Sequence, residues 1–253
     1  MVDFRRAHST QDVLSHVTRS RPDYPLIISK YGFEEVLQRL RLVKHGALDF
    51  DGTVSPGSQW ESVQRDLPED VLAQEHKDRD WYFAQVDTGQ TNGMTMDHPD
   101  WFHGTLLKDN RAAAEGAWSA RSIGRYVQCG FTEEDFITAG KRVEIRDGIP
   151  ELFDLLDQRV VISFGLQNVI EACLEHHGHP SPVAATRLLF DAEGRLTGFH
   201  PNVVVSSTKA AAVSRFLQLT GASEEEILAT GDSVVDVTMM RDNSFNIWIV
   251  SNY

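Results

Sequence analysis

The stretch Leu48-Asp49-Phe50-Asp51-Gly52-Thr53-Val54 decides how the rest of this chain is interpreted. Two aspartates stand two residues apart directly after an apolar-leaning segment, 45–48, and a Gly-Thr pair follows. Alternate residues of a strand point the same way, but where the strand ends Asp49 can face a cleft while Asp51 rises above it from the loop. A carboxylate nucleophile with a second carboxyl group as acid and base suits phosphoryl transfer. The alternative is an acidic turn, since Asp-Gly is a common turn dipeptide.

Downstream of residue 145 the pattern alternates between strands and helices. Strands are predicted over 159–164, 227–230 and 246–250, helices over 148–156, 169–177 and 208–219, and a hairpin over 188–199. Val160, Val161 and Ile162 give the first of these strands the composition of a buried one. Such alternation predicts an α/β fold, a parallel sheet with helices on both faces.

The segment 54–145 differs, because it is poor in strand patterns and rich in helix signals. Pro68 precedes one predicted helix, and the alanines within 106–127 predict a second. Thr132, followed by three acidic residues, predicts the start of a third helix. We expect an inserted, mostly helical unit over 54–145 and a core over 1–53 and 146–253. Within the core, residues 1–44 are expected to be a helical lead-in, because apolar residues recur there at helical spacing.

Three further groups of polar residues fall at predicted strand ends or helix starts, where open parallel sheets bind ligands. Ser163-Phe164-Gly165 ends a strand just before a helix, and a hydroxyl with free N–H groups there would seat a phosphate. Lys209 opens a helix, where a bound anion would explain a lysine beside the positive end of the dipole. Taken alone, each also fits an ordinary cap, turn or surface residue.

Gly231-Asp232 and Asp236 follow the predicted strand at 227–230. Together with Asp49, Asp232 and Asp236 would offer hard oxygen ligands in small number, which suits Mg²⁺. The alternative is an acidic helix N-cap with a first-turn aspartate.

In this order, the four groups resemble the motifs of the haloacid dehalogenase superfamily of Mg²⁺-dependent phosphohydrolases. Asp49-Phe50-Asp51-Gly52-Thr53 is similar to its first motif, Ser163 to the second, Lys209 to the third, and Gly231-Asp232 with Asp236 to the fourth. The resemblance covers about residues 45–250 and is closest to the branch of phosphoserine phosphatases and pyrimidine 5′-nucleotidases. It implies a Rossmann-like core with a helical cap of the family's first cap class.

The resemblance also implies roles for these residues. Asp49 would attack phosphorus and form an aspartyl-phosphate, while Asp51 would protonate the leaving alcohol and then activate water. Mg²⁺ would be held by Asp49, the backbone carbonyl of Asp51 and Asp232, with Asp236 in support. Ser163, with the adjacent Phe164-Gly165, and Lys209 would hold the phosphoryl oxygens.

The implied activity is hydrolysis of a small-molecule phosphomonoester. A 5′-nucleotidase or phosphotransferase of the same superfamily, or a binding protein without turnover, stay open as alternatives. The substrate itself is not predicted, because the cap lacks the residue pattern that would mark a phosphoserine phosphatase.

Four cap residues are candidates for substrate contact, namely Trp101, His103, Arg121 and Arg125. An aromatic side chain could stack on a base or sugar, and the two arginines lie four apart on one helix face. The alternatives are a packed aromatic core and a solvated face.

The composition limits the classes of binding partner that we expect for this protein. The net charge of −13 disfavours a broad nucleic-acid-binding face and an anionic membrane surface. We see no apolar run near the roughly 18 residues that span a bilayer. The two cysteines, Cys129 and Cys173, are not in a metal-like spacing, so we expect reduced thiols and a cytoplasmic protein. The expected partner is a small phosphorylated molecule, and the oligomeric state is left open.

Overall fold

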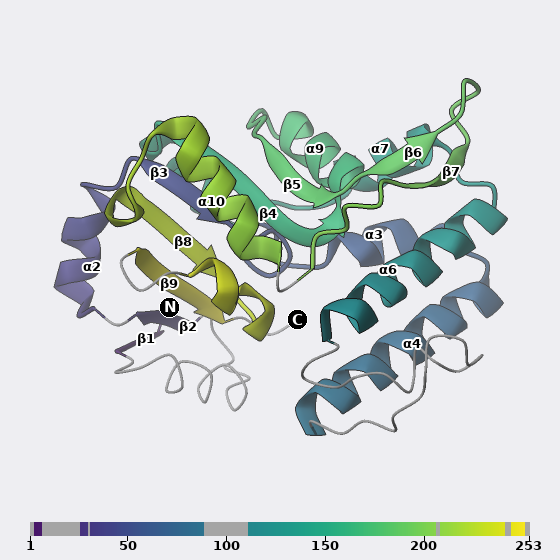
Figure 1. Cartoon of the computed structure of the whole chain (residues 1–253), viewed down its shortest axis with the longest axis horizontal. Helices are drawn as coiled ribbons and strands as arrows, with labels where there is room; N and C mark the ends of the chain where they lie inside the picture. Colours follow the sequence, from purple (N-terminus) through teal and green to yellow (C-terminus); the bar gives the residue numbers. More distant parts are fainter. Residues whose placement is uncertain are drawn as a thin grey trace.

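A computed structural model describes residues 3–6, 26–29, 31–88, 111–205, 208–240 and 244–250 of the 253-residue chain. Its central feature is a seven-stranded sheet with the strand order β1-β2-β9-β8-β3-β4-β5 (Figure 1). The five strands from β9 to β5 run parallel, whereas β2 pairs antiparallel with β9 and parallel with β1. The strands are β1 (Asp3–Arg6), β2 (Leu26–Ser29), β3 (His45–Leu48), β4 (Gln158–Leu166), β5 (Val183–Thr186), β8 (Ile227–Gly231) and β9 (Phe245–Val250).

Helices cover the sheet on both faces, as the alternating pattern predicted. The helices of the described part of the chain are α2 (Phe33–Leu40), α3 (Gln59–Gln64), α4 (Glu69–Thr88), α6 (Arg111–Gln128), α7 (Glu133–Lys141), α8 (Ile149–Leu155), α9 (Gln167–His176) and α10 (Lys209–Thr220), with 3₁₀ turns η3 (Glu224–Glu226) and η4 (Val234–Met239). Strands β6 (Leu188–Phe190) and β7 (Leu196–Phe199) form a separate antiparallel hairpin. Among the described helices, none combines the length and apolar character that crossing a bilayer requires.

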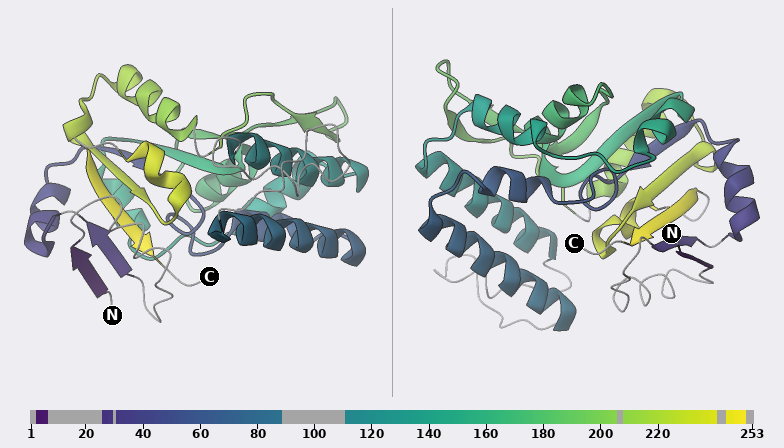
Figure 2. Two further views of the ribbon diagram at one scale, coloured as in Figure 1. Left: turned by 60° about the horizontal axis from the view of Figure 1, so that its bottom comes forward. Right: turned by 180° about the vertical axis from the view of Figure 1, so that it is seen from behind.

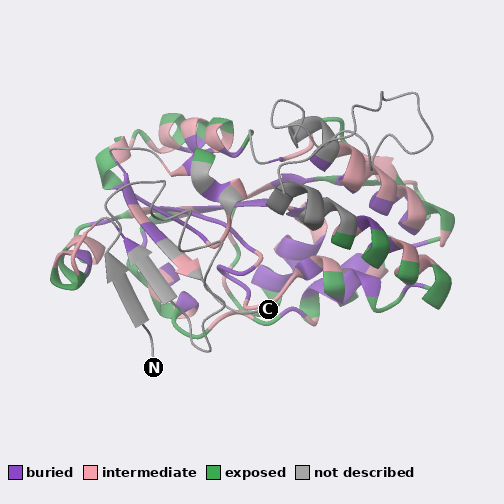
Figure 3. Cartoon of the chain, turned by 90° about the horizontal axis from the view of Figure 1, so that it is seen from below, coloured by how far each residue is buried: buried purple, intermediate pink, exposed green. Residues whose placement is uncertain are grey.

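The alternation of side chains along β3 and β4 divides the core in two. Leu48 and Val161 point into the larger core, which includes Val169 and Ile170 of α9, while Ala47 points into a smaller core under α10. Successive residues of a strand face opposite sides of a sheet, so a strand covered on both faces must be apolar throughout. The buried residues accordingly follow the sheet through the middle of the molecule (Figure 3).

The described part of the segment between β3 and β4 is mostly helical, as expected. Its helices α4 and α6 lie side by side, away from the large sheet, in each of the views (Figures 1 and 2). The helix α7 instead packs closely against α9 of the sheet layer, and α3 packs against α7. Within the described part of the insertion, α4 and α6 are therefore the helices that extend away from the sheet. The proposed limits of the insertion at 54 and 145 stay a prediction.

The helical lead-in predicted for residues 1–44 is wrong in part. Only α2 is helical in the described part of this region, and β1 and β2 extend the sheet by two strands. The run Leu26-Ile27-Ile28 is apolar and contains two β-branched isoleucines, and it pairs with β9 more than 200 residues later along the chain. The helical spacing of apolar residues did not predict these strands, because a strand is stabilised by pairing partners that lie far away in sequence. The short strand β5 was also missed.

Close packing between α7 and α9 depends on Gly140. A Cβ atom there would lie 2.4 Å from the carbonyl oxygen of Val169 and 2.7 Å from Cβ of Ala172. Gly124 of α6 is the opposite case, since no described atom lies within 4 Å of its Cβ position.

We therefore expect opposite effects from two identical substitutions. Gly140→Ala should lower the free energy of unfolding by about 1–3 kcal/mol, because backbone must move to admit the methyl group. Gly124→Ala should raise it by about 0.5–1 kcal/mol, because glycine disfavours a helix interior. Urea denaturation of both variants beside the wild type tests this, and a Gly140→Ala variant as stable as the wild type would contradict the packing.

Candidate active site

The register of the parallel strands brings the predicted site residues to one edge of the sheet. Leu48 of β3 lies opposite Val161 of β4 and Thr230 of β8. Asp49 follows directly, and its N–H donates to the carbonyl of Thr230 (2.9 Å). Ser163 and Asp232 come two residues after their paired positions, so the first, second and fourth predicted groups meet where the strands end.

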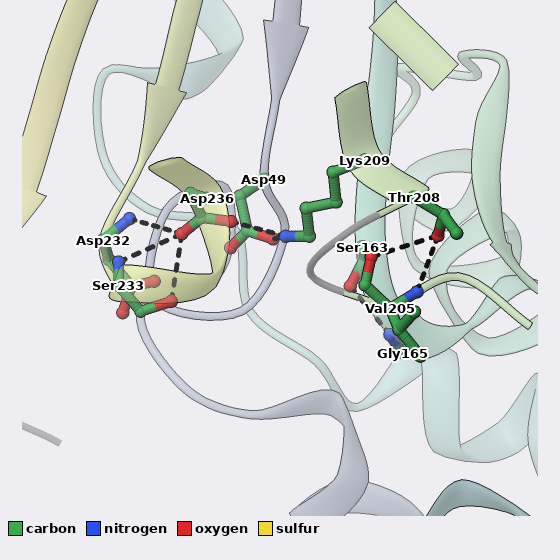
Figure 4. A network of polar contacts seen from close by, with 9 residues as sticks. All are labelled: Asp49, Ser163, Gly165, Val205, Thr208, Lys209, Asp232, Ser233 and Asp236. Carbon is green, nitrogen blue, oxygen red and sulfur yellow. Dashed lines mark hydrogen bonds and ion pairs between the residues drawn. The ribbon is translucent and has the colours of Figure 1, made fainter. Parts of the chain in front are cut away.

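A buried lysine joins two of these groups. Lys209 is fully buried at the start of α10, and its Nζ donates to Oδ1 of Asp49 (2.6 Å) and to Oδ1 of Asp236 (Figure 4). Both carboxylates are themselves buried. Burial alone lowers the pKa of an ammonium group, but the two carboxylates outweigh this and raise the pKa of Lys209 above its ordinary value.

Asp236 shapes the loop that carries Asp232. Its Oδ2 accepts hydrogen bonds from the N–H of Asp232 (3.1 Å), the N–H of Ser233 (3.0 Å) and Oγ of Ser233 (3.0 Å). The carboxylate packs so closely on Gly231 that a Cβ there would lie 2.4 Å from Cβ of Asp236. Both oxygens of Asp236 are thus engaged, and its role in supporting a metal ion stays a prediction.

Asp49, Asp232 and Asp236 form a candidate cation site. Each offers a carboxylate oxygen, and these atoms lie within 4.8 Å of one another. Burial and the carboxylate of Asp236 raise the pKa of Asp49, against the opposing effect of Lys209. Two of the three carboxylates, Asp49 and Asp236, share the buried ammonium of Lys209. Carboxylate oxygens of this kind fit a Mg²⁺ ion, which takes one or two carboxylates and keeps waters.

Asp51 lies on the loop after β3, and its carboxylate is held by the first residue of α3 rather than by Lys209. Its Oδ1 accepts a hydrogen bond from the N–H of Gln59, the first residue of α3 (2.7 Å). Desolvation raises the pKa of Asp51 to about 7, although the Gln59 N–H and the charge of Lys209 act in the opposite direction. A carboxyl group with such a pKa can carry a proton at neutral pH and release it, which is what an acid–base catalyst requires.

Ser163 lies at the predicted edge but in a different local structure. We expected a seat at a helix N-terminus, whereas β4 continues to Leu166 and α9 begins only at Gln167. Four steps along β4 from Ile162 to Leu166 match two steps along β5, so Ser163–Gly165 bulge out of the ladder. Within this bulge, Oγ of the buried Ser163 accepts the N–H of Gly165 (3.0 Å).

The side chain of Phe164, between these two residues, contacts the inserted helices. Its ring lies 6.1 Å from that of Trp118 on α6, centroid to centroid, in a tilted arrangement. This contact brings the inserted helices to the same edge of the sheet as Ser163.

The cap candidates have mixed outcomes. Trp101 and His103 lie outside the described residues. Arg121 and Arg125 share a face of α6, as predicted, and both pair with Asp78 of α4, Arg121 at 3.4 Å. Arg125 also binds the buried Glu75. The pairs tie α6 to α4, so contact of the two arginines with a substrate stays a prediction.

One residue that touches the site was missed by sequence reasoning. Gln59 is fully buried, and its side chain lies so close to Gly165 that a Cβ there would be 2.7 Å from Nε2. The signal that could have found it is Ser58, whose side chain caps the N-terminus of α3 by accepting the N–H of Trp60.

Comparison with known proteins agrees with this geometry. The family model of haloacid dehalogenase-like hydrolases matches residues 47–241. The chain belongs to this family. The match spans every strand-end group described above, from Asp49 to Asp236. No curated protein sequence matches the chain.

Solved structures share the fold at low sequence identity. A cytosolic 5′-nucleotidase IIIB bound to cytidine has a TM-score of 0.60 and 18% identity, over 89% of this chain and 80% of that one. A phospho-aspartyl intermediate analogue of phosphoserine phosphatase has a TM-score of 0.55 and 19% identity, over 78% and 81%. A hydrolase of the family from Salmonella enterica serovar Typhi has a TM-score of 0.56 and 15% identity, over 78% of this chain but only 58% of that one.

The buried lysine leads to a stability prediction. Lys209→Met should lower the free energy of unfolding by about 3–5 kcal/mol, because it leaves two buried carboxylates without their cation. The change raises the pKa of Asp49 further, so the folded variant takes up protons that the unfolded chain lacks. Its stability should therefore rise as the pH falls from 8 to 5.

Chemical denaturation at the two pH values measures this effect. Lys141→Met, at an exposed lysine at the end of α7, is the control and should stay within about 0.5 kcal/mol of the wild type. A Lys209→Met protein as stable as this control at pH 8 would show that the lysine does not balance the carboxylates.

Proposed function

We propose that this protein is a Mg²⁺-dependent phosphatase that hydrolyses a small-molecule phosphomonoester through an aspartyl-phosphate on Asp49. The observation that carries the proposal is the buried Asp49 carboxylate, held at 2.6 Å by Lys209, with Asp51, whose pKa is raised to about 7 by desolvation, two residues later. Membership of the hydrolase family supports it. The chain also shares its fold with a phosphoserine phosphatase, solved as a phospho-aspartyl intermediate analogue, and with a 5′-nucleotidase. A shared fold supports the same type of chemistry.

The first half of the reaction makes the covalent intermediate. An oxygen of Asp49 attacks phosphorus, the bond from phosphorus to the ester oxygen breaks, and Asp51 gives its proton to the departing alcohol. Lys209 keeps Asp49 oriented and reduces its repulsion from the phosphate dianion. The hydroxyl of Ser163 and the bulged backbone beside it would bind the phosphoryl oxygens.

The second half restores the enzyme. Asp51, now ionised, accepts a proton from a water molecule as that water attacks phosphorus, and the bond between phosphorus and the Asp49 oxygen breaks. Inorganic phosphate leaves, Asp49 is a carboxylate again and Asp51 is protonated again. Bound Mg²⁺, held by Asp49, Asp232 and the backbone carbonyl of Asp51, would supply the positive charge that offsets the phosphate.

We also propose that residues 54–145 act as a cap over this edge of the sheet. The support is the position of α3, α4 and α6 between β3 and β4, together with the contact of Trp118 with Phe164. A cap of this kind would exclude water and select the alcohol part of the substrate.

Phosphate release from a panel of monoesters tests the activity. The panel contains O-phosphoserine, glycerol phosphate, nucleoside 5′-monophosphates and p-nitrophenyl phosphate, each with Mg²⁺ and with EDTA. We expect release that requires Mg²⁺ and falls at least about 1,000-fold in Asp49→Asn, since the nucleophile is lost. Asp80→Asn, at an exposed aspartate of α4, is the matched control and should keep the wild-type rate.

Two further measurements identify the intermediate and the alternatives. Acid quenching during turnover of a ³²P-labelled substrate should trap label on the protein in a form that hydroxylamine removes. Transfer of the label to an added alcohol would indicate a phosphotransferase. If Mg²⁺ binds but no compound releases phosphate, the chain is a binding protein and the proposal fails.

A further inference from the structure

A single arginine holds the loop that carries Asp51. The guanidinium of Arg146 donates from Nη2 to the carbonyl of Gly52 (2.7 Å) and from Nε to the carbonyl of Thr53 (3.1 Å). Its backbone N–H donates to the carbonyl of Val54 (2.9 Å). One residue thus binds three successive carbonyls, beginning directly after Asp51, from more than 90 positions away in sequence.

The loop needs such an anchor because of its shape. Gly52 turns the chain through a left-handed conformation (φ +78°), and Thr53 and Val54 are fully buried. Carbonyl groups in a buried, irregular segment form no regular ladder, so other donors must satisfy them. The planar fork of an arginine can serve two carbonyls at once, which the single ammonium of a lysine does less well.

The position of Arg146 gives this contact a consequence for the site. Asp51 is fixed on one side by the N–H of Gln59 in α3 and is followed on the other by the carbonyls that Arg146 binds. Arg146 stands where the chain returns from the inserted helices to α8, whereas Val54 stands where it leaves the core. The arginine therefore joins the outgoing and returning segments next to the proton donor.

We propose that Arg146 is a positioning residue for Asp51. By fixing the carbonyls of Gly52 and Thr53, it keeps the Asp51 carboxyl group where it can protonate the leaving alcohol. The inference rests on the proposed phosphatase function and adds to it a residue outside the four motif groups.

Leaving-group dependence separates this role from a general structural one. Expulsion of an alkoxide requires a proton, whereas p-nitrophenolate leaves with little help from an acid. Arg146→Met should lower kcat/KM about 10–100-fold for the alkyl monoester that the wild type hydrolyses best, but less than about 3-fold for p-nitrophenyl phosphate. This ratio covers only the steps up to release of the alcohol, before Asp51 acts as the base in the step that all substrates share. Arg146→Lys should recover part of the kcat/KM for the alkyl ester.

Arg142→Met is the matched control. Arg142 also donates to a backbone carbonyl, that of Ser62 (2.9 Å), and it pairs with Asp66, but it does not bind the Asp51 loop. The Arg142→Met variant should lower the two kcat/KM values by the same factor or not at all. Hydrogen–deuterium exchange over residues 50–57 should be faster in Arg146→Met than in this control.

The outcomes are distinct. An equal loss on both substrates in Arg146→Met, or unchanged exchange over 50–57, would overturn the positioning role while leaving the phosphatase proposal intact. A wild-type protein that hydrolyses no monoester would remove the proposed function, and with it this inference. A selective loss on the alkyl ester together with faster exchange would support it.

Discussion

The buried ammonium of Lys209 between Asp49 and Asp236 is the interaction on which the site depends. Two carboxylates this close repel each other, and moving them out of water costs several kcal/mol unless a cation compensates. Lys209 comes from α10, Asp49 from the end of β3 and Asp236 from η4, so the contact requires all three elements in place. Electrostatics therefore couples the fold of the core to the geometry around Asp49.

The parallel sheet determines where that cluster forms. Parallel strands in register end at one edge, and each following loop meets its neighbours there. Glycine at 231 allows the closest of these approaches, because a side chain would collide with Asp236. The bulge of β4 then turns Ser163 and Gly165 out of the ladder, so their polar groups need not pair with β5. The backbone thus supplies the site, and few side chains need special conformations.

Much of the core was predictable from the sequence because its signals are local. The apolar run at 160–162 and the helix-start signal at Thr132 each mark an element that the structure contains. The aspartate pair at 49 and 51 and the Gly-Asp pair at 231 and 232 were recognisable for the same reason.

What sequence reasoning missed depends on distant partners. Strand β2 is a strand because it pairs with β9, and nothing within 1–44 reveals that pairing. The end of β4 was misplaced because a bulge is set by the neighbouring strand and not by the residues inside it. The contact of Gln59 with Asp51 was invisible because it needs the turn of the intervening loop.

Two clusters of buried charge stand out among the described residues, and their composition distinguishes their roles. Between α4 and α6, Arg125 binds both Glu75 and Asp78, Arg121 adds a second contact to Asp78, and Ser122 donates to Glu75. Arginines on α6 thus pair with carboxylates on α4, and these ion pairs hold the two helices together.

At the sheet edge the balance differs. Asp49, Asp232 and Asp236 lie close together with Lys209 paired to two of them, and the pKa of Asp49 is raised even with that lysine beside it. A cluster with excess negative charge is stabilised by a further cation, and a cation there attracts an anionic substrate to the same place. The excess charge that makes this cluster costly for folding is therefore what suits it to bind a metal ion and a phosphate together.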